Sequence, residues 1–136
     1  MSQASPSAVP TSAERDVLFK TFGRAWFKRD VAQLYDAVTE DFVWASIDGT
    51  GRQMRIASRA AVAAEFAAMA ERPTKTQFAD VVYHHAADAT FMTFRLIESN
   101  PVTGAIVREE VGVERYTFRD GRIALKDVYR KVATGG

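Results

Sequence analysis

The chain of 136 residues contains no cysteine, which excludes a thiol nucleophile, a thiolate metal site and a disulfide framework. It also lacks an excess of one charge, since 18 Lys and Arg residues stand against 17 Asp and Glu residues. A net charge of +1 argues against a nucleic-acid partner, whose binding surface is usually basic. No apolar run approaches the roughly 20 residues of a membrane-spanning helix. We therefore expect a cytoplasmic protein that binds neither membrane nor nucleic acid.

The first eleven residues, MSQASPSAVPT, lack the features of a secretory signal. They have no basic start and no apolar stretch, and their small polar residues and two prolines are typical of a disordered tail. The length of the chain fits one domain, which we expect to span residues 12–132, with residues 133–136 as a C-terminal tail. Nine Phe residues are the one unusual feature of the composition, and they could either line a cavity or fill a core.

The first half of the chain carries three signals for helix starts. Thr11 followed by Glu14 predicts a capping box, after which apolar residues recur at helical spacing to about Arg29. Asp30 and Ser58 predict the N-caps of a short second helix and of an alanine-rich third helix. These patterns predict three N-terminal helices, the third of which follows a strand.

Strand patterns dominate the rest of the chain. Runs rich in β-branched and aromatic residues are separated by turns that contain Asn, Asp and Gly. The predicted strands cover residues 42–47, 76–85, 90–98, 106–118 and 122–132. The order helix, helix, strand, helix and then four strands predicts an α+β fold, in which three N-terminal helices pack on a strongly curved, mainly antiparallel sheet.

Three segments then carry a resemblance to a known family. They are Arg29-Asp30-Val31, the run from Thr39 to Trp44, and the run from Asp120 to Ile123 with Tyr129 beyond it. With the element order, they make residues 12–132 resemble the nuclear transport factor 2-like superfamily, which includes ketosteroid isomerase and the SnoaL-like polyketide cyclases. The resemblance implies a cone-shaped fold that holds a small apolar ligand or substrate without a cofactor. It also implies a homodimer formed through the outer face of the sheet.

The resemblance to ketosteroid isomerase implies three catalytic positions, two of which are changed here. Phe22 stands in place of a tyrosine and cannot donate a hydrogen bond. Ser46 stands in place of the carboxylate base and is far too weak a base to replace it. Glu114 matches the acid position. Limonene epoxide hydrolase chemistry is not expected either, because Arg95 falls near its arginine but its carboxylate positions hold Ile97 and Val128.

The last hairpin decides which side chains accompany Glu114. A two-residue Asp-Gly loop would place like charges opposite each other, whereas a three-residue loop over residues 119–121 places Glu114 opposite Lys126 and Glu110 opposite Arg130. We predict the three-residue loop. The charged face can then line the cone, as the family positions imply, or it can be a solvated ladder. With the charges inside, the outer face of the hairpin carries Val111, Val113, Ile123, Leu125 and Tyr129. We expect four of them, Val111, Val113, Leu125 and Tyr129, to form an apolar dimer surface.

The predicted catalytic residues are Glu114, Lys126 and Asp48, and for Asp48 the alternative is a turn-forming role. The predicted ligand-binding residues are Phe22, Trp26, Trp44, Ser46, Phe66, Phe94, Glu110, Val128 and Arg130. Core packing is the alternative role for each aromatic. His84 and His85 are adjacent on a strand and point to opposite faces, so they cannot share a metal ion. No spacing typical of a metal site is present, and we expect none.

Three functions fit these residues. The first is a cofactor-independent isomerase, cyclase or dehydratase that acts on a small apolar substrate, with Glu114 as the ionisable group and Lys126 tuning it. The second is a protein that binds a hydrophobic ligand without chemistry. The third is an assembly protein whose cone is filled by Phe and Trp. An open pocket with Glu114 at its base would favour the first function, and a filled cone the third.

Overall fold

The computed structural model describes residues 9–133, so most of the two predicted tails lies outside the described residues. The described chain forms three helices and six strands. In chain order these are α1 (Ser12–Lys28), α2 (Val31–Leu34), β1 (Val38–Ile47), β2 (Gln53–Ile56), α3 (Arg59–Ala70), β3 (Lys75–His85), β4 (Ala89–Ser99), β5 (Ile106–Arg119) and β6 (Arg122–Val132). None of the helices in this range is long and apolar enough to span a bilayer.

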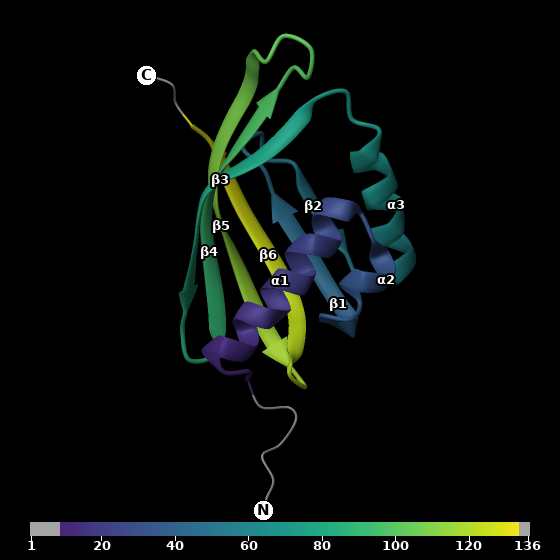
Figure 1. Cartoon of the computed structure of the whole chain (residues 1–136), viewed down its shortest axis with the longest axis vertical. Helices are drawn as coiled ribbons and strands as arrows, with labels where there is room; N and C mark the ends of the chain where they lie inside the picture. The colour runs from purple at the N-terminus through teal and green to yellow at the C-terminus, as the bar shows by residue number, and fades with distance from the viewer. Residues whose placement is uncertain (1–8, 134–136) are drawn as a thin grey trace, which may run out of the picture.

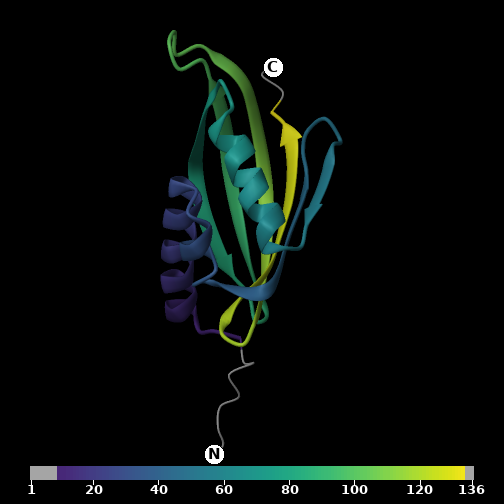
Figure 2. The same cartoon turned by 90° about the vertical axis from the view of Figure 1, so that its right-hand side faces the viewer.

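The six strands form one sheet in the order β2-β1-β6-β5-β4-β3. Strands β1 and β6 pair in parallel, and all other neighbours are antiparallel. Helix α1 crosses the concave face of the bent sheet, and α3 lies on the same side, between α1 and β2 in the view of Figure 2 (Figures 1 and 2). The predicted fold class, an α+β cone with helices on a curved and mainly antiparallel sheet, is therefore confirmed.

The helices begin where the predicted caps stand. The Thr11 hydroxyl accepts a hydrogen bond from the Glu14 N–H at 3.2 Å, and the Glu14 carboxylate accepts one from the Thr11 N–H at 2.8 Å. The side chains of Asp30 and Ser58 cap α2 and α3 in the same way. Strands β3 to β6 agree with the prediction to within one residue at each end, but β1 begins four residues earlier, at Val38, and the short edge strand β2 was not predicted. Four residues are too few for an alternating pattern to stand out.

The loop between β5 and β6 corrects the predicted three-residue turn. Arg119 pairs with Arg122, so the loop has only two residues, Asp120 and Gly121, with φ angles of 55° and 74°. Left-handed φ angles at both positions are typical of a tight type I′ hairpin turn, for which Asp-Gly is a favoured sequence. The preference of Asp-Gly for this turn therefore outweighs the repulsion between the two exposed arginines that lie opposite each other.

A bulge then shifts the register of the same hairpin by one residue. Phe118 pairs with Ile123 but Thr117 pairs with Leu125, so Ala124 is the extra residue. Ile123 is fully buried and does not lie on the outer face as predicted, because the bulge changes the side to which it points. Beyond the bulge, the register differs from the predicted one by two residues, and an even shift leaves every side chain on its predicted face.

A buried arginine that the sequence analysis did not single out ties α1 to the sheet. The Arg15 side chain is only 4% exposed. Its guanidinium group donates to the carbonyl oxygens of Pro10, Ala86, Ala87 and Ala89 and to the Thr90 hydroxyl. It thereby joins the start of α1 to the connection between β3 and β4.

The turn between β1 and β2 docks on the far ends of β5 and β6. The Gly49 N–H donates to Glu110 Oε2 at 2.8 Å. A Cβ atom on Gly49 would lie 2.6 Å from that oxygen and 2.7 Å from the backbone nitrogen of Val132. The turn can approach this closely only because residue 49 has no side chain.

We predict opposite effects for alanine at two glycines. Gly49→Ala should destabilise the fold by about 1–3 kcal/mol, because the clash with backbone atoms forces the turn away from Glu110. Gly23→Ala is the matched control: it lies in α1 with nothing near its Cβ position and should stabilise by about 0.5–1 kcal/mol. Urea unfolding of both variants measures these changes. A Gly49→Ala protein as stable as the parent would show that the turn does not dock as described.

Candidate functional site

An ion pair lies in the interior between the sheet and α1. Lys126 Nζ on β6 is 2.6 Å from Glu114 Oε1 on β5, and the two side chains are 6% and 3% exposed. The predicted pair is therefore present, but its partners are diagonal neighbours: Glu114 lies opposite Val128, and Lys126 lies opposite Tyr116. Of the two orientations that the sequence left open, the structure has the one with these charges inside the cone.

Tyr116 is the third member of this group, which we call the buried triad: Glu114, Tyr116 and Lys126. The Tyr116 hydroxyl donates to Glu114 Oε1 and accepts a hydrogen bond from Lys126 Nζ at 3.2 Å. The sequence analysis missed Tyr116. Its position two residues after Glu114 on the same strand could have identified it, because residues i and i+2 share a face.

Burial changes the ionisation of two triad members. Burial and the adjacent Glu114 carboxylate raise the pKa of Tyr116 well above its ordinary value, so this hydroxyl keeps its proton and remains a donor. Burial lowers the pKa of Lys126, against the opposing pull of the Glu114 charge. Lys126 therefore loses its proton more readily than a solvated lysine does, which is a common property of functional lysines.

Aromatic rings surround the triad. Lys126 Nζ lies 4.4 Å from the centre of the Trp26 ring and 5.4 Å from the centres of the Phe22 and Tyr116 rings. Trp26 in turn contacts Trp44 and Phe66, with ring centres 4.4 and 5.0 Å apart. The structure thus brings together four of the five predicted aromatic residues, Phe22, Trp26, Trp44 and Phe66. The four rings pack against one another, and Phe22 and Trp26 also lie against the lysine.

A second charged cluster lies farther along the inner face, beside the β1–β2 turn. The buried Glu110 carboxylate is 2.6 Å from Arg108 Nη2 and 3.4 Å from Arg130 Nη1. The Nε atoms of both arginines are buried without a hydrogen-bond partner among the described residues. The remaining predicted ligand-binding residues, Ser46, Phe94 and Val128, belong to the same inner face, where Ser46 pairs with Val128 and Phe94 lies opposite Gly112.

Asp48 is not part of either cluster, and its side chain shapes the β1–β2 turn. Its Oδ1 atom accepts hydrogen bonds from the Thr50 hydroxyl, the Thr50 N–H and the Arg52 N–H. These bonds lower the pKa of Asp48, and the bond from the Thr50 hydroxyl has the largest effect. A carboxylate stabilised in its charged form is a poor base, so the structure favours the turn-forming alternative for Asp48.

The other charged candidates also lie away from the triad. Arg95 is on the outer face of the sheet, where it pairs with Glu109. His84 contacts Thr93, whereas His85 contacts Thr90 and Asp16, so the two imidazoles have separate partners, as their opposite directions predicted. Within residues 9–133, no group of three or more His, Asp or Glu side chains is arranged to hold a metal ion.

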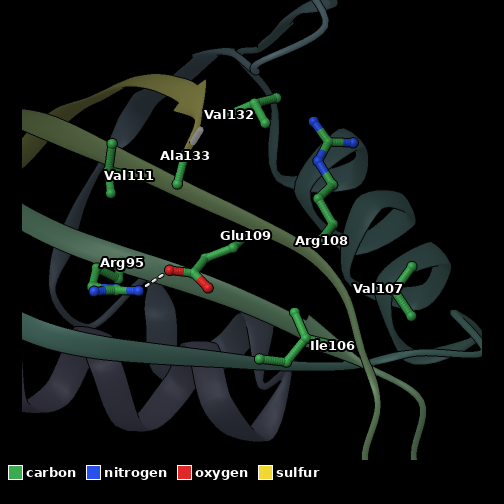
Figure 3. Close-up of a pocket in the computed structure, with 8 residues that line it drawn as sticks. All are labelled: Arg95, Ile106, Val107, Arg108, Glu109, Val111, Val132 and Ala133. Atoms are coloured by element: carbon green, nitrogen blue, oxygen red, sulfur yellow. Dashed lines mark hydrogen bonds and ion pairs between the residues drawn. The ribbon is translucent and has the colours of Figure 1, made fainter. Parts of the chain in front are cut away.

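Two hollows lie on the outer face of the sheet rather than in the cone. The larger, of about 740 Å³, includes the Arg95–Glu109 pair, whose side chains point toward each other (Figure 3). It is lined by Arg95, Ile106, Val107, Arg108, Glu109, Val111, Val132 and Ala133. The second, of about 430 Å³, adjoins Val111, Val113 and Tyr129. Three of the four residues predicted for a dimer surface therefore line these hollows.

We predict that Lys126→Met destabilises the fold by about 3–5 kcal/mol near pH 7, because it leaves the Glu114 carboxylate buried without a cation. Urea titrations near pH 7 measure the loss. Lys131→Met, which changes an exposed lysine of the same strand, should be nearly neutral. A negligible loss for Lys126→Met would contradict the buried pair.

Solved structures with the same fold come from several bacteria. An NTF2-like protein from Burkholderia xenovorans LB400 is 16% identical, with a TM-score of 0.68 over 91% of this chain and 92% of that one. A candidate polyketide cyclase from Xanthomonas campestris pv. campestris is 19% identical, with a TM-score of 0.64 over 86% and 90%. A candidate isomerase from Bacillus subtilis is 18% identical, with a TM-score of 0.64 over 87% and 88%. At such identities the similarity shows the fold alone.

Among curated protein sequences, none matches this chain. The sequence profile of the SnoaL-like domain, by contrast, matches residues 19–126, a range that runs from α1 to β6. This range includes all three residues of the buried triad and the aromatic rings around it. The chain therefore belongs to the SnoaL-like domain family.

Proposed function

We propose that this protein binds a small, mostly apolar molecule in its cone and acts on it by acid–base chemistry without a cofactor, as an isomerase, cyclase or dehydratase. The observation that carries the proposal is the buried triad, above all the 2.6 Å ion pair between Glu114 and Lys126. Similarity to a candidate polyketide cyclase and a candidate isomerase is in keeping with this class of reaction.

A buried ion pair is poorly explained by stability alone. Removing two charges from water costs several kcal/mol per ion, and apolar residues of similar volume often serve a core equally well or better. Phe22 and Trp26, which already contact Lys126, show that this interior accommodates large apolar side chains. A charged pair in such surroundings is therefore better explained by a use for its charges.

The triad provides the groups that proton transfer at carbon needs. The Glu114 carboxylate can accept a proton from a carbon next to a substrate carbonyl group, and can return it to another atom. The Lys126 ammonium group can offset the negative charge that develops on the substrate oxygen. Tyr116, which keeps its proton, holds the Glu114 carboxylate in place through its hydrogen bond.

One observation favours a second candidate, a non-catalytic ligand-binding or assembly protein. The rings of Trp26, Trp44 and Phe66 lie in contact and occupy the space beside Lys126. A ligand must therefore either displace these rings or occupy the inner face nearer the β1–β2 turn, where Ser46 and Met54 are only half-buried. Ligand binding without turnover, or no binding at all, would favour this second candidate.

The first test is a thermal-shift screen of the protein against steroids, aromatic polyketide-like compounds, terpenoids and fatty acids. A ligand that binds only the folded state must raise the melting temperature. With a substrate identified, Glu114→Gln should lower kcat by roughly a hundredfold or more, the usual contribution of a general base. It should also lower the free energy of unfolding, because it leaves Lys126 buried without its carboxylate, so turnover is measured under conditions in which circular dichroism shows the variant folded. Glu109→Gln on the outer face is the matched control. Unchanged turnover in Glu114→Gln would contradict the role of Glu114.

We also propose a homodimer through the outer face of the sheet, around Val111, Val113, Leu125 and Tyr129. Valine side chains and the half-exposed Tyr129 adjoin the two hollows there, and a symmetric contact between two copies would cover them. A cytoplasmic location, and the lack of membrane and nucleic-acid partners, stay predictions from the sequence.

We predict a mass of twice 15.1 kDa by light scattering at micromolar concentration, and a monomer for Val113→Lys, because a charge at the centre of an apolar contact is costly to bury. Val17→Lys is the control, since Val17 is an exposed residue of α1 on the other side of the sheet. A dimer that survives Val113→Lys would place the interface elsewhere.

A further inference from the structure

Lys126 differs from the other lysines of this chain in its surroundings. Lys20, Lys28, Lys75 and Lys131 are exposed, whereas Lys126 is 4% exposed and has aromatic rings around its nitrogen. Its nitrogen also has a carboxylate at 2.6 Å and a phenol oxygen at 3.2 Å. An amine, a carboxyl group that can exchange protons with it and an apolar wall are together the requirements for attack of a lysine on a carbonyl group.

We propose that Lys126 is a nucleophile that forms a Schiff base with a small, uncharged aldehyde or ketone, and that Glu114 transfers the protons of this reaction. The inference deepens the proposed function, since both require the cone to admit a small apolar molecule. It differs from it in assigning a covalent intermediate. The substrate class follows from the surroundings, because a paired, net-neutral site with aromatic walls favours an uncharged carbonyl compound over a charged one.

The neutral amine is available without separating charges in the interior. The Lys126 ammonium group passes a proton to the Glu114 carboxylate along their 2.6 Å contact, which leaves an amine beside a carboxylic acid. Two neutral groups are cheaper to hold in apolar surroundings than two ions. The shift of the Lys126 pKa below its ordinary value has the same cause, burial.

The bond changes balance with these two residues alone. The lone pair of the Lys126 nitrogen forms the C–N bond, and the carbonyl oxygen takes the proton from Glu114. Glu114 then removes a proton from the nitrogen and gives it to the hydroxyl group, which leaves as water while the nitrogen lone pair forms the C=N bond. The product is a protonated imine beside an ionised Glu114, which is the charge pattern of the free site.

The inner face gives a carbonyl compound a route to this nitrogen. Val128 on β6, Ser46 on β1 and Met54 on β2 pair side by side across the sheet, and exposure rises along this row from the buried Val128 to the half-buried Ser46 and Met54 near the β2 edge. Trp26 is itself only partly buried, so movement of one ring opens the contact to Lys126. Small aldehydes need less of this movement than large ones.

The test uses benzaldehyde and sodium cyanoborohydride, which reduces the imine to a stable secondary amine, with the intact protein near pH 7. Peptide mapping by mass spectrometry then locates the adduct. We expect one adduct per chain, nearly all of it on Lys126 and little on the four exposed lysines. Label on the exposed lysines with none on Lys126, or label on Lys126 only after unfolding in urea, would overturn the inference.

Two variants separate the chemistry from the fold. Lys126→Arg keeps a cation beside Glu114 but cannot form an imine, so its adduct should be lost, whereas Lys131→Arg should keep it. Glu114→Gln retains the lysine and should slow labelling by roughly a hundredfold, the usual effect of losing general acid–base catalysis. Unchanged labelling of Glu114→Gln would remove Glu114 from the step. If Lys126→Arg does not fold, the distribution of label among the lysines of the unaltered protein still tests whether Lys126 is the nucleophile.

The outcomes also distinguish this inference from the proposed function. If the protein binds or converts a compound from the ligand screen but Lys126 never carries label, the acid–base function is supported and the covalent step is ruled out. If Lys126 carries label but no compound of the screen is bound or converted, the nucleophile is supported and the proposed function is ruled out.

Discussion

The opposite charges of Glu114 and Lys126 lie in an apolar interior and limit how the residues around them can be arranged. Glu114 and Lys126 are nearly inaccessible to water, so each must be stabilised by the other, by Tyr116 and by the faces of aromatic rings. This requirement fixes the neighbouring strands relative to each other, because a slip of one residue would turn one of the charges to the opposite face. The aromatic residues of α1 then seal the pair from solvent, which links the position of the helix to the chemistry beneath it.

The fold could be predicted from the sequence because its signals are local. Caps such as Thr11 and Asp30 are satisfied within three residues, and the long strands show their alternation directly. The hairpin between β5 and β6 was harder, since its register depends on a bulge at Ala124 that no local pattern marks. The predicted faces were nevertheless right for Glu114 and Lys126, because the one-residue error in the turn and the one-residue shift at the bulge add to an even shift. Ile123 lies before the bulge and was therefore assigned to the wrong face.

The parts of the site that sequence reasoning missed depend on contacts between distant residues. Arg15 looks like an ordinary surface arginine of a helix until the β3–β4 connection, more than 70 residues later, surrounds it with carbonyl oxygens. The contact of Gly49 with Glu110 is likewise visible only once the turn and the sheet are in place. Tyr116 was the exception, since its spacing from Glu114 already placed the two on one face.

The parallel pairing of β1 with β6 has a consequence for how the chain folds. It joins Val43 to Leu125 and Trp44 to Lys126, residues separated by 82 positions in the sequence, whereas the hairpins β3–β4, β4–β5 and β5–β6 join near neighbours. Contacts of such long range form slowly, because the intervening chain must close into a long loop, at a cost in entropy, before the contacts can stabilise the fold. During synthesis, β5 leaves the ribosome before β6, so Glu114 has no cation until the following hairpin strand emerges. Strand β6 therefore supplies both the cation for Glu114 and the parallel partner of β1, and neither can be in place before β6 has formed.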